Sequence, residues 1–159
     1  MKSFLLLLFC FLNAQAQPIQ SASPEELADR LAPQTVATRS LRNLVPAPRH
    51  IDLIINFDLG SSVMLESSKA LVKNLATAMN SDRVKEMKFR VEGHTDAVGN
   101  PQSNKLLSEK RAKSVVDLLV VEGVDQSRLI SEGMGQTQLL LPDQPRAREN
   151  RRVRISSVD

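Results

Sequence analysis

Aromatic residues are scarce in this sequence of 159 residues, which has five Phe, no Trp and no Tyr. This scarcity argues against nucleic-acid binding, because proteins that hold single strands stack the bases on aromatic rings beside a basic groove. Basic residues that no aromatic residue accompanies gather near the C-terminal end, namely Arg146, Arg148, Arg151, Arg152 and Arg154. The formal net charge is only +3, with 21 basic and 18 acidic residues well mixed, as on a solvated surface. We expect no nucleic-acid partner.

Residues of the usual catalytic and metal sites are also scarce. The sequence has one Cys and two His, His50 and His94, which are far apart, so a zinc site is not expected. It contains no G-x-S-x-G motif. His94, Asp96 and Ser108 are the three residue types of a catalytic triad, but their spacing gives no activated nucleophile. We therefore expect a protein that is not an enzyme and that needs no metal or cofactor.

The first 16 residues have the pattern of a secretory signal peptide. Lys2 supplies the positive charge, and residues 14–16 form a small-x-small cleavage site. The apolar run at 4–12 is too short to cross a bilayer as a helix, although a retained N-terminal anchor is the alternative. Cys10 follows Phe9 rather than the small residue that precedes a lipidated cysteine, so we expect it to be removed with the signal peptide. The mature chain then has no disulfide and no transmembrane segment, and we expect it in the periplasm.

Residues 17–50 are expected to form a proline-containing tether in front of a domain at 51–159. The segment is interrupted by proline at positions 18, 24, 33, 46 and 48. Within it, Ser23 followed by Pro predicts the start of a short helix that carries Leu27 and Leu31. Two alternatives remain. The segment either spaces the domain from its neighbours or docks on a partner, or it is a partly ordered tail packed on the domain itself.

Apolar periodicity in the domain predicts strands and helices in the order β-α-β-α-β-β. The expected strands are 51–58, 86–92, 128–132 and 151–156, and the expected helices are 66–79 and 101–122. Asn100, followed by Pro, caps the second helix, and Gly123 ends it. Leu65 is a poor cap for the first helix, so Ser67 or Ser68 is expected to cap it one turn later. The order predicts an α+β fold, a βαβαββ sandwich with two helices packed on a four-stranded mixed sheet that ends in an antiparallel pair.

Two charges stand out between positions 91 and 112, where a strand, a polar loop and a long helix follow one another. Asp96 lies in the loop. Arg111 is four residues after Leu107 and four before Val115, and so lies in the apolar stripe of the helix. A guanidinium keeps its proton there and needs an anionic partner. Asp96 is one candidate partner, and the carboxylate of a bound ligand is the other.

The same stretch carries a family resemblance. Its motif residues are Gly93-His94-Thr95-Asp96, Asn104, Leu107-Ser108, Arg111-Ala112 and Val115, with Phe57-Asp58 before them and Asn150-Arg151-Arg152-Val153 after them. In this order and spacing they resemble the signature of the OmpA-like peptidoglycan-binding domain family, over residues 51–156. The resemblance agrees with the α+β fold. It implies that Asp96 and Arg111 hold the diaminopimelate residue of the cell-wall stem peptide.

Several signature residues keep two interpretations each. Gly93, His94 and Thr95 are expected to offer backbone N–H groups to the carboxylate of the ligand, because glycine allows close approach. In the alternative for His94, the side chain packs or caps the loop. The resemblance implies that Asn104 lines the pocket, since it lies two helical turns from Arg111 on the same face. Its alternative is an ordinary asparagine on the helix surface.

The remaining signature residues are also open. Asp58 either contacts the stem peptide or forms a turn. Leu107 either walls the pocket or belongs to the core. Arg151 is expected on the same strand face as Val153, pointing toward the core side, where it supports or neutralises the site. Whether Arg151 or Arg152 has this role is left open.

Two functions of different classes follow. The first is non-catalytic binding of peptidoglycan through the diaminopimelate of its stem peptide, which anchors an envelope component to the cell wall, with a possible association with the outer membrane. The second is a protein–protein scaffold of an envelope complex for secretion or motility, in which the wall-binding site is degenerate. The segment 17–50 motivates the second function. In that case Asp96 and Arg111 only join the loop to the helix.

Overall fold

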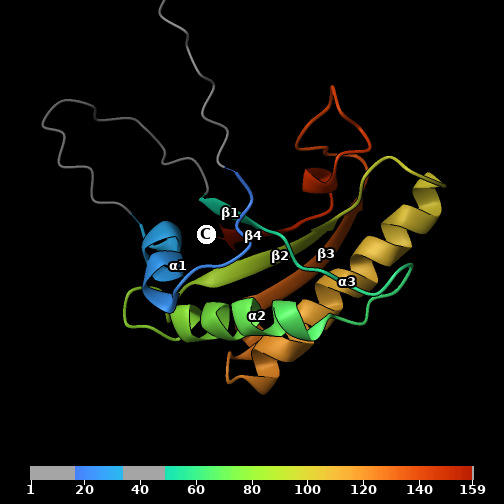
Figure 1. The fold of residues 1–159 in the computed structure, drawn as a ribbon. Coiled ribbons are helices and arrows are strands. Elements are labelled where there is room, and N and C mark those ends of the chain that lie inside the picture. The colour runs from blue at the N-terminus through green and yellow to red at the C-terminus, as the bar shows by residue number, and fades with distance from the viewer. Residues whose placement is uncertain (1–16, 34–48, 159) are drawn as a thin grey trace, which may run out of the picture.

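The computed structural model describes residues 17–33 and 49–158 (Figure 1). The helices are α1 (Pro24–Leu31), α2 (Glu66–Met79) and α3 (Pro101–Val121), and the strands are β1 (His50–Leu53), β2 (Lys88–His94), β3 (Leu129–Gly135) and β4 (Val153–Val158). Two short 3-10 turns, η1 (Gln126–Arg128) and η2 (Arg148–Asn150), precede β3 and β4. The expected signal peptide, residues 1–16, lies outside the described residues and stays a prediction.

Local sequence rules place both ends of α3. The side chain of Asn100 accepts the N–H groups of Gln102 and Ser103, which have no partner within the helix. Gly123, just past the last turn, adopts a φ of 93°, in the left-handed region that favours glycine. The prediction of a helix at 101–122 is confirmed to within one residue.

The first predicted helix, 66–79, is α2. Its cap position holds Leu65, which makes no side-chain cap hydrogen bond. The serine cap expected one turn later is wrong, because the Ser68 hydroxyl accepts the N–H of Asn56 at 2.9 Å. Ser68 therefore fastens the chain that leaves β1 to α2.

The four strands form one mixed sheet in the order β1-β4-β2-β3. β4 is antiparallel to both β1 and β2, and β2 is parallel to β3. The α+β prediction of helices on a four-stranded mixed sheet is confirmed. The antiparallel closing pair is wrong, because β3 and β4 are not neighbours. The long connection between them carries β4 across β2, so that β4 satisfies backbone groups on both β1 and β2.

The first strand is shorter than the predicted 51–58. β1 ends at Leu53, which is paired with Val153, the first residue of β4. Beyond this point β4 offers no partner, and the chain leaves the sheet. It then forms one isolated bridge, between Phe57 and Met64. The apolar alternation of 51–58 therefore reflects burial in the core rather than one continuous strand.

One face of the sheet carries the core. In one row of the register, Ile51 of β1 faces Ile155 of β4, which faces Val91 of β2. These side chains are buried with Phe89 and with the inner sides of α2 and α3, which lie along this face (Figure 1). Alternate residues of the same strands, such as Asp52, point to the other face.

Residues 17–33 pack on the domain. Ile19 makes two backbone hydrogen bonds, of 2.7 and 2.8 Å, along the outer edge of β1. The predicted short helix is α1, with the predicted serine cap, and its Leu27 and Leu31 are buried in the core beside α2. For residues 17–33 the structure contradicts the prediction of a tether and agrees with the alternative, a tail packed on the domain. Residues 34–48 lie outside the described residues.

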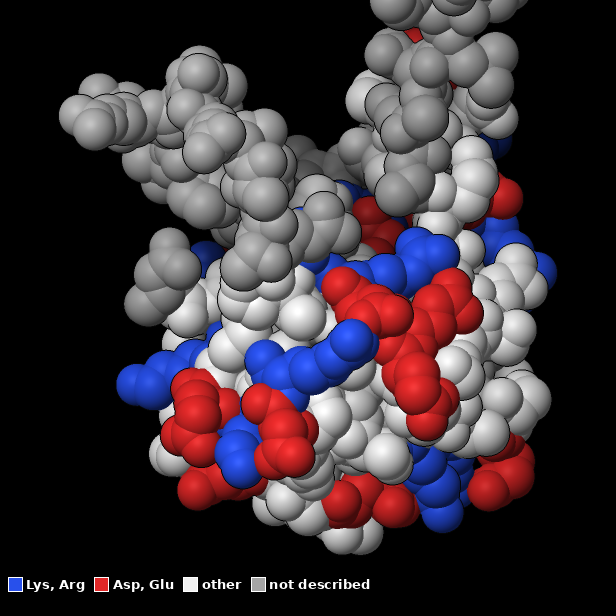
Figure 2. Space-filling model, turned by 90° about the vertical axis from the view of Figure 1, so that its left-hand side faces the viewer, with Lys and Arg blue, Asp and Glu red and all other residues white. Residues whose placement is uncertain are grey.

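The surface beside α1 carries charges of both signs. Figure 2 shows basic and acidic side chains next to one another on this side of the molecule. Exposed ion pairs join Arg30 to Glu26 and Arg83 to Asp29. Such pairs contribute little to stability one by one. This mixture agrees with the solvated surface expected from the composition.

Candidate functional site

The predicted site begins where β2 ends. β2 stops at His94, and Asp96 follows in the loop that leads to α3. One carboxylate oxygen of Asp96 accepts the N–H of Val98 at 3.1 Å, and the other lies 2.7 Å from a guanidinium nitrogen of Arg151. The Asp96 side chain is only 13% exposed. Asp96 is therefore a fixed carboxylate, held by its own loop on one side and by Arg151 on the other.

Arg111 approaches this group from α3. Its Nε donates to the carbonyl oxygen of Ser61 at 2.9 Å, and its guanidinium lies over the ring of Phe57, 4.9 Å from the centroid. Among the described residues it forms no ion pair, so Asp96 is not its direct partner. Burial lowers the pKa of Arg111, and the positive charge of Arg151 lowers it further, while Asp96 raises it. The charges of Asp96 and Arg151 thus both act on Arg111.

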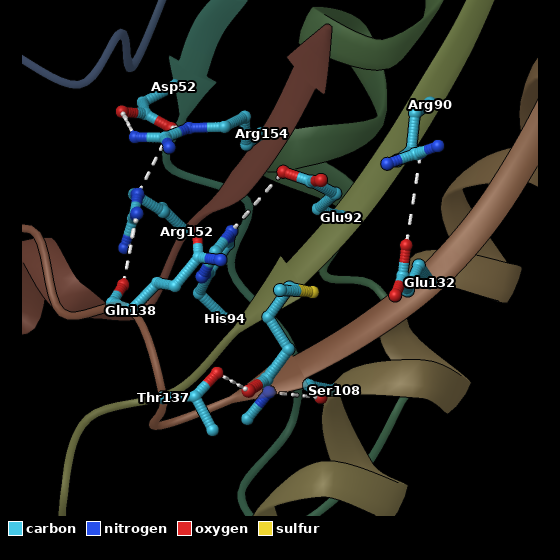
Figure 3. Close-up of polar contacts among 12 residues, drawn as sticks. Asp52, Arg90, Glu92, His94, Ser108, Glu132, Thr137, Gln138, Arg152 and Arg154 are labelled. Atoms are coloured by element: carbon cyan, nitrogen blue, oxygen red, sulfur yellow. Dashed lines mark hydrogen bonds and ion pairs between the residues drawn. The ribbon is translucent and has the colours of Figure 1, made fainter.

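The orientation of Arg151 differs from the predicted one. β4 begins at Val153, so the alternation of the strand does not extend back to position 151. The Arg151 side chain is 45% exposed, whereas Arg152 is buried and donates from Nε to Asp52 at 3.0 Å (Figure 3). The expectation that Arg151 points toward the core is wrong. Of the two arginines, Arg151 is the one beside Asp96.

Asp52 is a charged residue that the sequence analysis missed. It accepts two hydrogen bonds of 2.9 Å from Arg154 and one from Arg152 (Figure 3). Burial raises the pKa of Asp52, but these two arginines outweigh it and hold that pKa below its usual value. A charged residue inside the apolar run of β1 is the sequence signal that could have revealed it. This buried group joins β1 to β4 and is separate from the Asp96 site.

The backbone at the end of β2 is already hydrogen-bonded within the protein. The N–H of His94 donates to a carbonyl just before β4, and the N–H of Thr95 donates to one at the end of β3, both at 2.9 Å. The expectation that these two N–H groups serve a ligand is wrong. Gly93 faces α3, because an added Cβ would overlap the carbonyl oxygen of Ser108. Its role is close packing of the helix on the sheet.

His94 is expected to make the stability of the protein depend on pH. Its side chain is fully buried, and burial lowers its pKa to about 3, with the positive charges of Arg152 and Arg154 acting in the same direction. In the unfolded chain the pKa is about 6.5, so below that pH the unfolded state binds more protons than the folded state. We expect the free energy of unfolding to fall as the pH is lowered from about 6.5 to 4.5, with a slope that approaches about 1.4 kcal/mol per pH unit at the lower end, measured in urea.

His94→Phe tests this dependence, because phenylalanine fills a similar buried volume without a titrating group. Its slope of stability against pH should be flatter than that of the wild type in the same range. His50→Gln is the matched control at an exposed histidine and should keep the wild-type slope. A slope that His94→Phe leaves unchanged would assign the acid sensitivity to other groups.

Asn104 ties the Asp96 loop to α3. Its amide nitrogen donates to the carbonyl of Val98 at 3.0 Å and to the side chain of Gln136 at 2.7 Å. A longer contact of 3.4 Å reaches the carbonyl of Asp96 itself. The amide therefore holds in place the loop that carries the carboxylate.

The other two predicted residues are Leu107 and Asp58. Leu107 is half-buried on α3. Asp58 is exposed and forms a turn, in which its carbonyl accepts the N–H of Ser61 at 3.0 Å. This turn presents the Ser61 carbonyl, together with the Phe57 ring, to Arg111, a contact that the sequence did not predict. A phenylalanine in a chain with so few aromatic residues was the available signal.

Comparison with known proteins assigns the chain and its fold to one family. The sequence profile of the OmpA family matches residues 56–153, which include Asp96, Arg111 and Arg151. The chain belongs to the OmpA family. The family resemblance expected from the signature residues is thereby confirmed.

Individual OmpA relatives match parts of the chain. Outer membrane protein A of Serratia marcescens is 41% identical over 85 residues, which cover 54% of this chain and 23% of that protein. The chain thus spans about a quarter of the length of this curated relative. The peptidoglycan-associated lipoprotein of Burkholderia pseudomallei is 25% identical, with a TM-score of 0.53 over 67% of this chain and 87% of that one. The periplasmic domain of Helicobacter pylori MotB, 18% identical, has a TM-score of 0.61 over 72% and 78% and supports the fold alone.

The names of these three proteins refer to the outer membrane, the periplasm or peptidoglycan and not to a catalysed reaction. None of the helices in the described part of the chain is long and apolar enough to cross a membrane. Within residues 17–33 and 49–158, no three His, Cys, Asp or Glu side chains gather as a metal site requires. The candidate site of this OmpA-family protein consists of charged groups. They are the fixed carboxylate of Asp96 and the guanidinium groups of Arg111 and Arg151.

Proposed function

We propose that the protein binds peptidoglycan in the periplasm without catalysis, through the diaminopimelate of the stem peptide. One observation carries the proposal. Arg111 is a half-buried cation that, among the described residues, has a carbonyl and an aromatic ring as partners but no carboxylate. A buried guanidinium is stabilised by an anion, so a ligand carboxylate is the partner that fits it.

The free end of diaminopimelate matches this arrangement. It carries an ammonium and a carboxylate on one carbon. Asp96 can accept the ammonium, and the guanidinium of Arg111 can donate two parallel hydrogen bonds to the carboxylate. Each charge-assisted hydrogen bond contributes about 1.5–3 kcal/mol. Lysine in place of Arg111 would keep the charge but lose the planar fork, so Arg111→Lys should retain little of the wild-type binding.

The names of the relatives support an envelope location. They refer to the outer membrane, the periplasm and peptidoglycan. In this proposal the domain anchors an envelope component to the cell wall from the periplasmic side. The scaffold alternative now has less support, because residues 17–33, part of the segment that motivated it, pack on the domain.

Co-sedimentation with purified sacculi that contain diaminopimelate tests the proposal. We expect the wild type to sediment with the wall, and both Asp96→Ala and Arg111→Ala to weaken binding at least about tenfold, because each removes a charge-assisted contact. Free meso-diaminopimelate should release the wild type. Circular dichroism should show that both variants remain folded.

Lys110→Ala is the matched control, since it removes an exposed positive charge from the residue next to Arg111 on α3. It should bind like the wild type. If no folded variant loses binding, or if the wild type does not bind at all, the charges at Asp96 and Arg111 are structural, and the scaffold function becomes the better explanation.

A further inference from the structure

The carboxylate of Asp96 is shared with a positive charge of the protein itself. Its second oxygen lies 2.7 Å from a guanidinium nitrogen of Arg151. In the proposed function this oxygen accepts the ammonium of the ligand. The cation of Arg151 therefore lies in the place that the ligand cation must take.

Of the two partners, Asp96 is the fixed one. Its other oxygen is held by the N–H of Val98, and its loop is held by Asn104. The Arg151 side chain is 45% exposed, and within the described residues its one side-chain hydrogen bond is the bond to Asp96. A long, exposed side chain with a single hydrogen bond can move away from Asp96 without disturbing the backbone. The backbone itself is fixed by a hydrogen bond of 2.9 Å from the N–H of Arg151 to the carbonyl of Arg148.

The neighbouring arginine could not exchange partners in this way. Arg152 is buried and donates both to Asp52 and to the carbonyl of Gln138 (Figure 3). Releasing it would leave the Asp52 carboxylate buried with fewer partners. Of the two neighbouring arginines before β4, only Arg151 can therefore be displaced from its carboxylate.

The charges of the site are also unequal. Arg111 and Arg151 are two cations beside one carboxylate, and the charge of Arg151 lowers the pKa of Arg111, so the two guanidinium groups repel each other. A ligand that brings a carboxylate together with an ammonium replaces every contact that it breaks. Its ammonium binds Asp96, and its carboxylate accepts hydrogen bonds from both arginines. A ligand that brings only an ammonium leaves both arginines without an anion.

From this geometry we infer that Arg151 is a specificity-determining residue, which competes with the ligand ammonium for Asp96 and so rejects amines that lack an adjacent carboxylate. The inference rests on the proposed function. It predicts selection between two kinds of stem peptide. A peptide with meso-diaminopimelate ends in an ammonium and a carboxylate on one carbon, whereas a peptide with lysine has the ammonium alone at the end of that side chain.

Two synthetic tripeptides test the inference by calorimetry on the full chain, L-Ala–γ-D-Glu–meso-diaminopimelate and L-Ala–γ-D-Glu–L-Lys. The wild type should bind the first more tightly. Arg151→Gln should bind the lysine peptide about three- to fivefold more tightly than the wild type does, which is the range expected when a partly exposed competing pair is removed. The same variant should bind the diaminopimelate peptide no more tightly than the wild type. A structural role for Arg151 predicts no gain for either peptide.

Arg146→Gln is the matched control, because it removes another exposed positive charge from the same connection between β3 and β4. It should give no gain for the lysine peptide. If Arg146→Gln gains as much as Arg151→Gln, or if Arg151→Gln gains nothing while the wild type binds the diaminopimelate peptide, this inference is overturned and the proposed function stands. If the wild type binds neither peptide nor sacculi, the proposed function fails, and the inference fails with it.

Discussion

Gly93→Ala is expected to lower the free energy of unfolding by at least about 3 kcal/mol. Gly93 lies on β2 at the point where α3 approaches the sheet, and an added Cβ would overlap the carbonyl oxygen of Ser108 and lie 2.9 Å from its carbonyl carbon. These are backbone atoms of a helix, so they can yield only if α3 moves away from the sheet. Far-UV circular dichroism in urea measures the effect, since the chain has no Trp or Tyr for fluorescence.

Two other glycines separate steric overlap from backbone strain. Gly133→Ala on β3 should behave like Gly93→Ala, because its Cβ would lie 2.7 Å from the Cα of Glu109. Gly60 has a φ of 64° but open space around it, so Gly60→Ala should cost only about 1–2 kcal/mol, from the left-handed conformation. Equal losses in Gly93→Ala and Gly60→Ala would contradict the close approach of α3.

The close approach also positions the site. Gly93 and Gly133 let the backbone of α3 lie against β2 and β3 near Ser108 and Glu109. Arg111 follows within one turn, so its distance from the Asp96 loop depends on this packing. A variant that pushes α3 outward but stays folded should therefore bind sacculi more weakly as well.

Arg128→Ala is expected to cost about 3 kcal/mol or more, since one guanidinium serves three main-chain acceptors. Arg128 donates at 2.8–2.9 Å to the carbonyls of Met79, Val84 and Met87, and it lies over the ring of Phe89. These carbonyls belong to the end of α2 and to the turn that leads into β2. Without the guanidinium they lose a charged donor in a partly buried place. The urea midpoint should fall while the denaturant slope stays unchanged.

Two variants bracket this result. Arg128→Lys keeps the charge but cannot reach three carbonyls with one planar group, so it should recover less than half of the loss. Arg83→Ala removes an arginine from an exposed pair with Asp29 and should cost about 1 kcal/mol or less. A loss at Arg128 no larger than that at Arg83 would show that the hydrogen bonds contribute little to stability.

Local rules in the sequence predicted the helices well. The cap at Asn100 and the glycine at 123 gave the ends of α3, and the apolar stripe at 66–79 gave α2. Caps and helical periodicity act over a few residues, so they can be read without knowledge of distant contacts. The bounds and pairing of the strands were predicted less well, because each strand depends on the strand beside it. β1 stops at Leu53 only because β4 begins opposite that residue, 100 positions later.

The site shows the same division. The signature predicted that Asp96 and Arg111 belong to one group, but it left open whether Arg151 or Arg152 joins them and how the charges pair. Asp96 is 55 residues from Arg151, and Arg111 is 50 residues from the Ser61 carbonyl that it contacts. Sequence spacing carries no information about such contacts. Arg151 was assigned to the core side because strand alternation was extended two residues too far.

The sequence by itself determined the family, the two long helices, the short capped helix at the start and the charged residues of the site, because each depends on neighbouring residues or on an ordered motif. The tertiary structure alone decided that β4 lies between β1 and β2, that residues 17–33 pack on the core, and that Arg151 rather than Arg111 holds Asp96. The physical reason is that strand order, core docking and ion pairing are set by contacts between residues far apart in the chain. Many such pairings satisfy the same local pattern, and only the packed fold selects one of them.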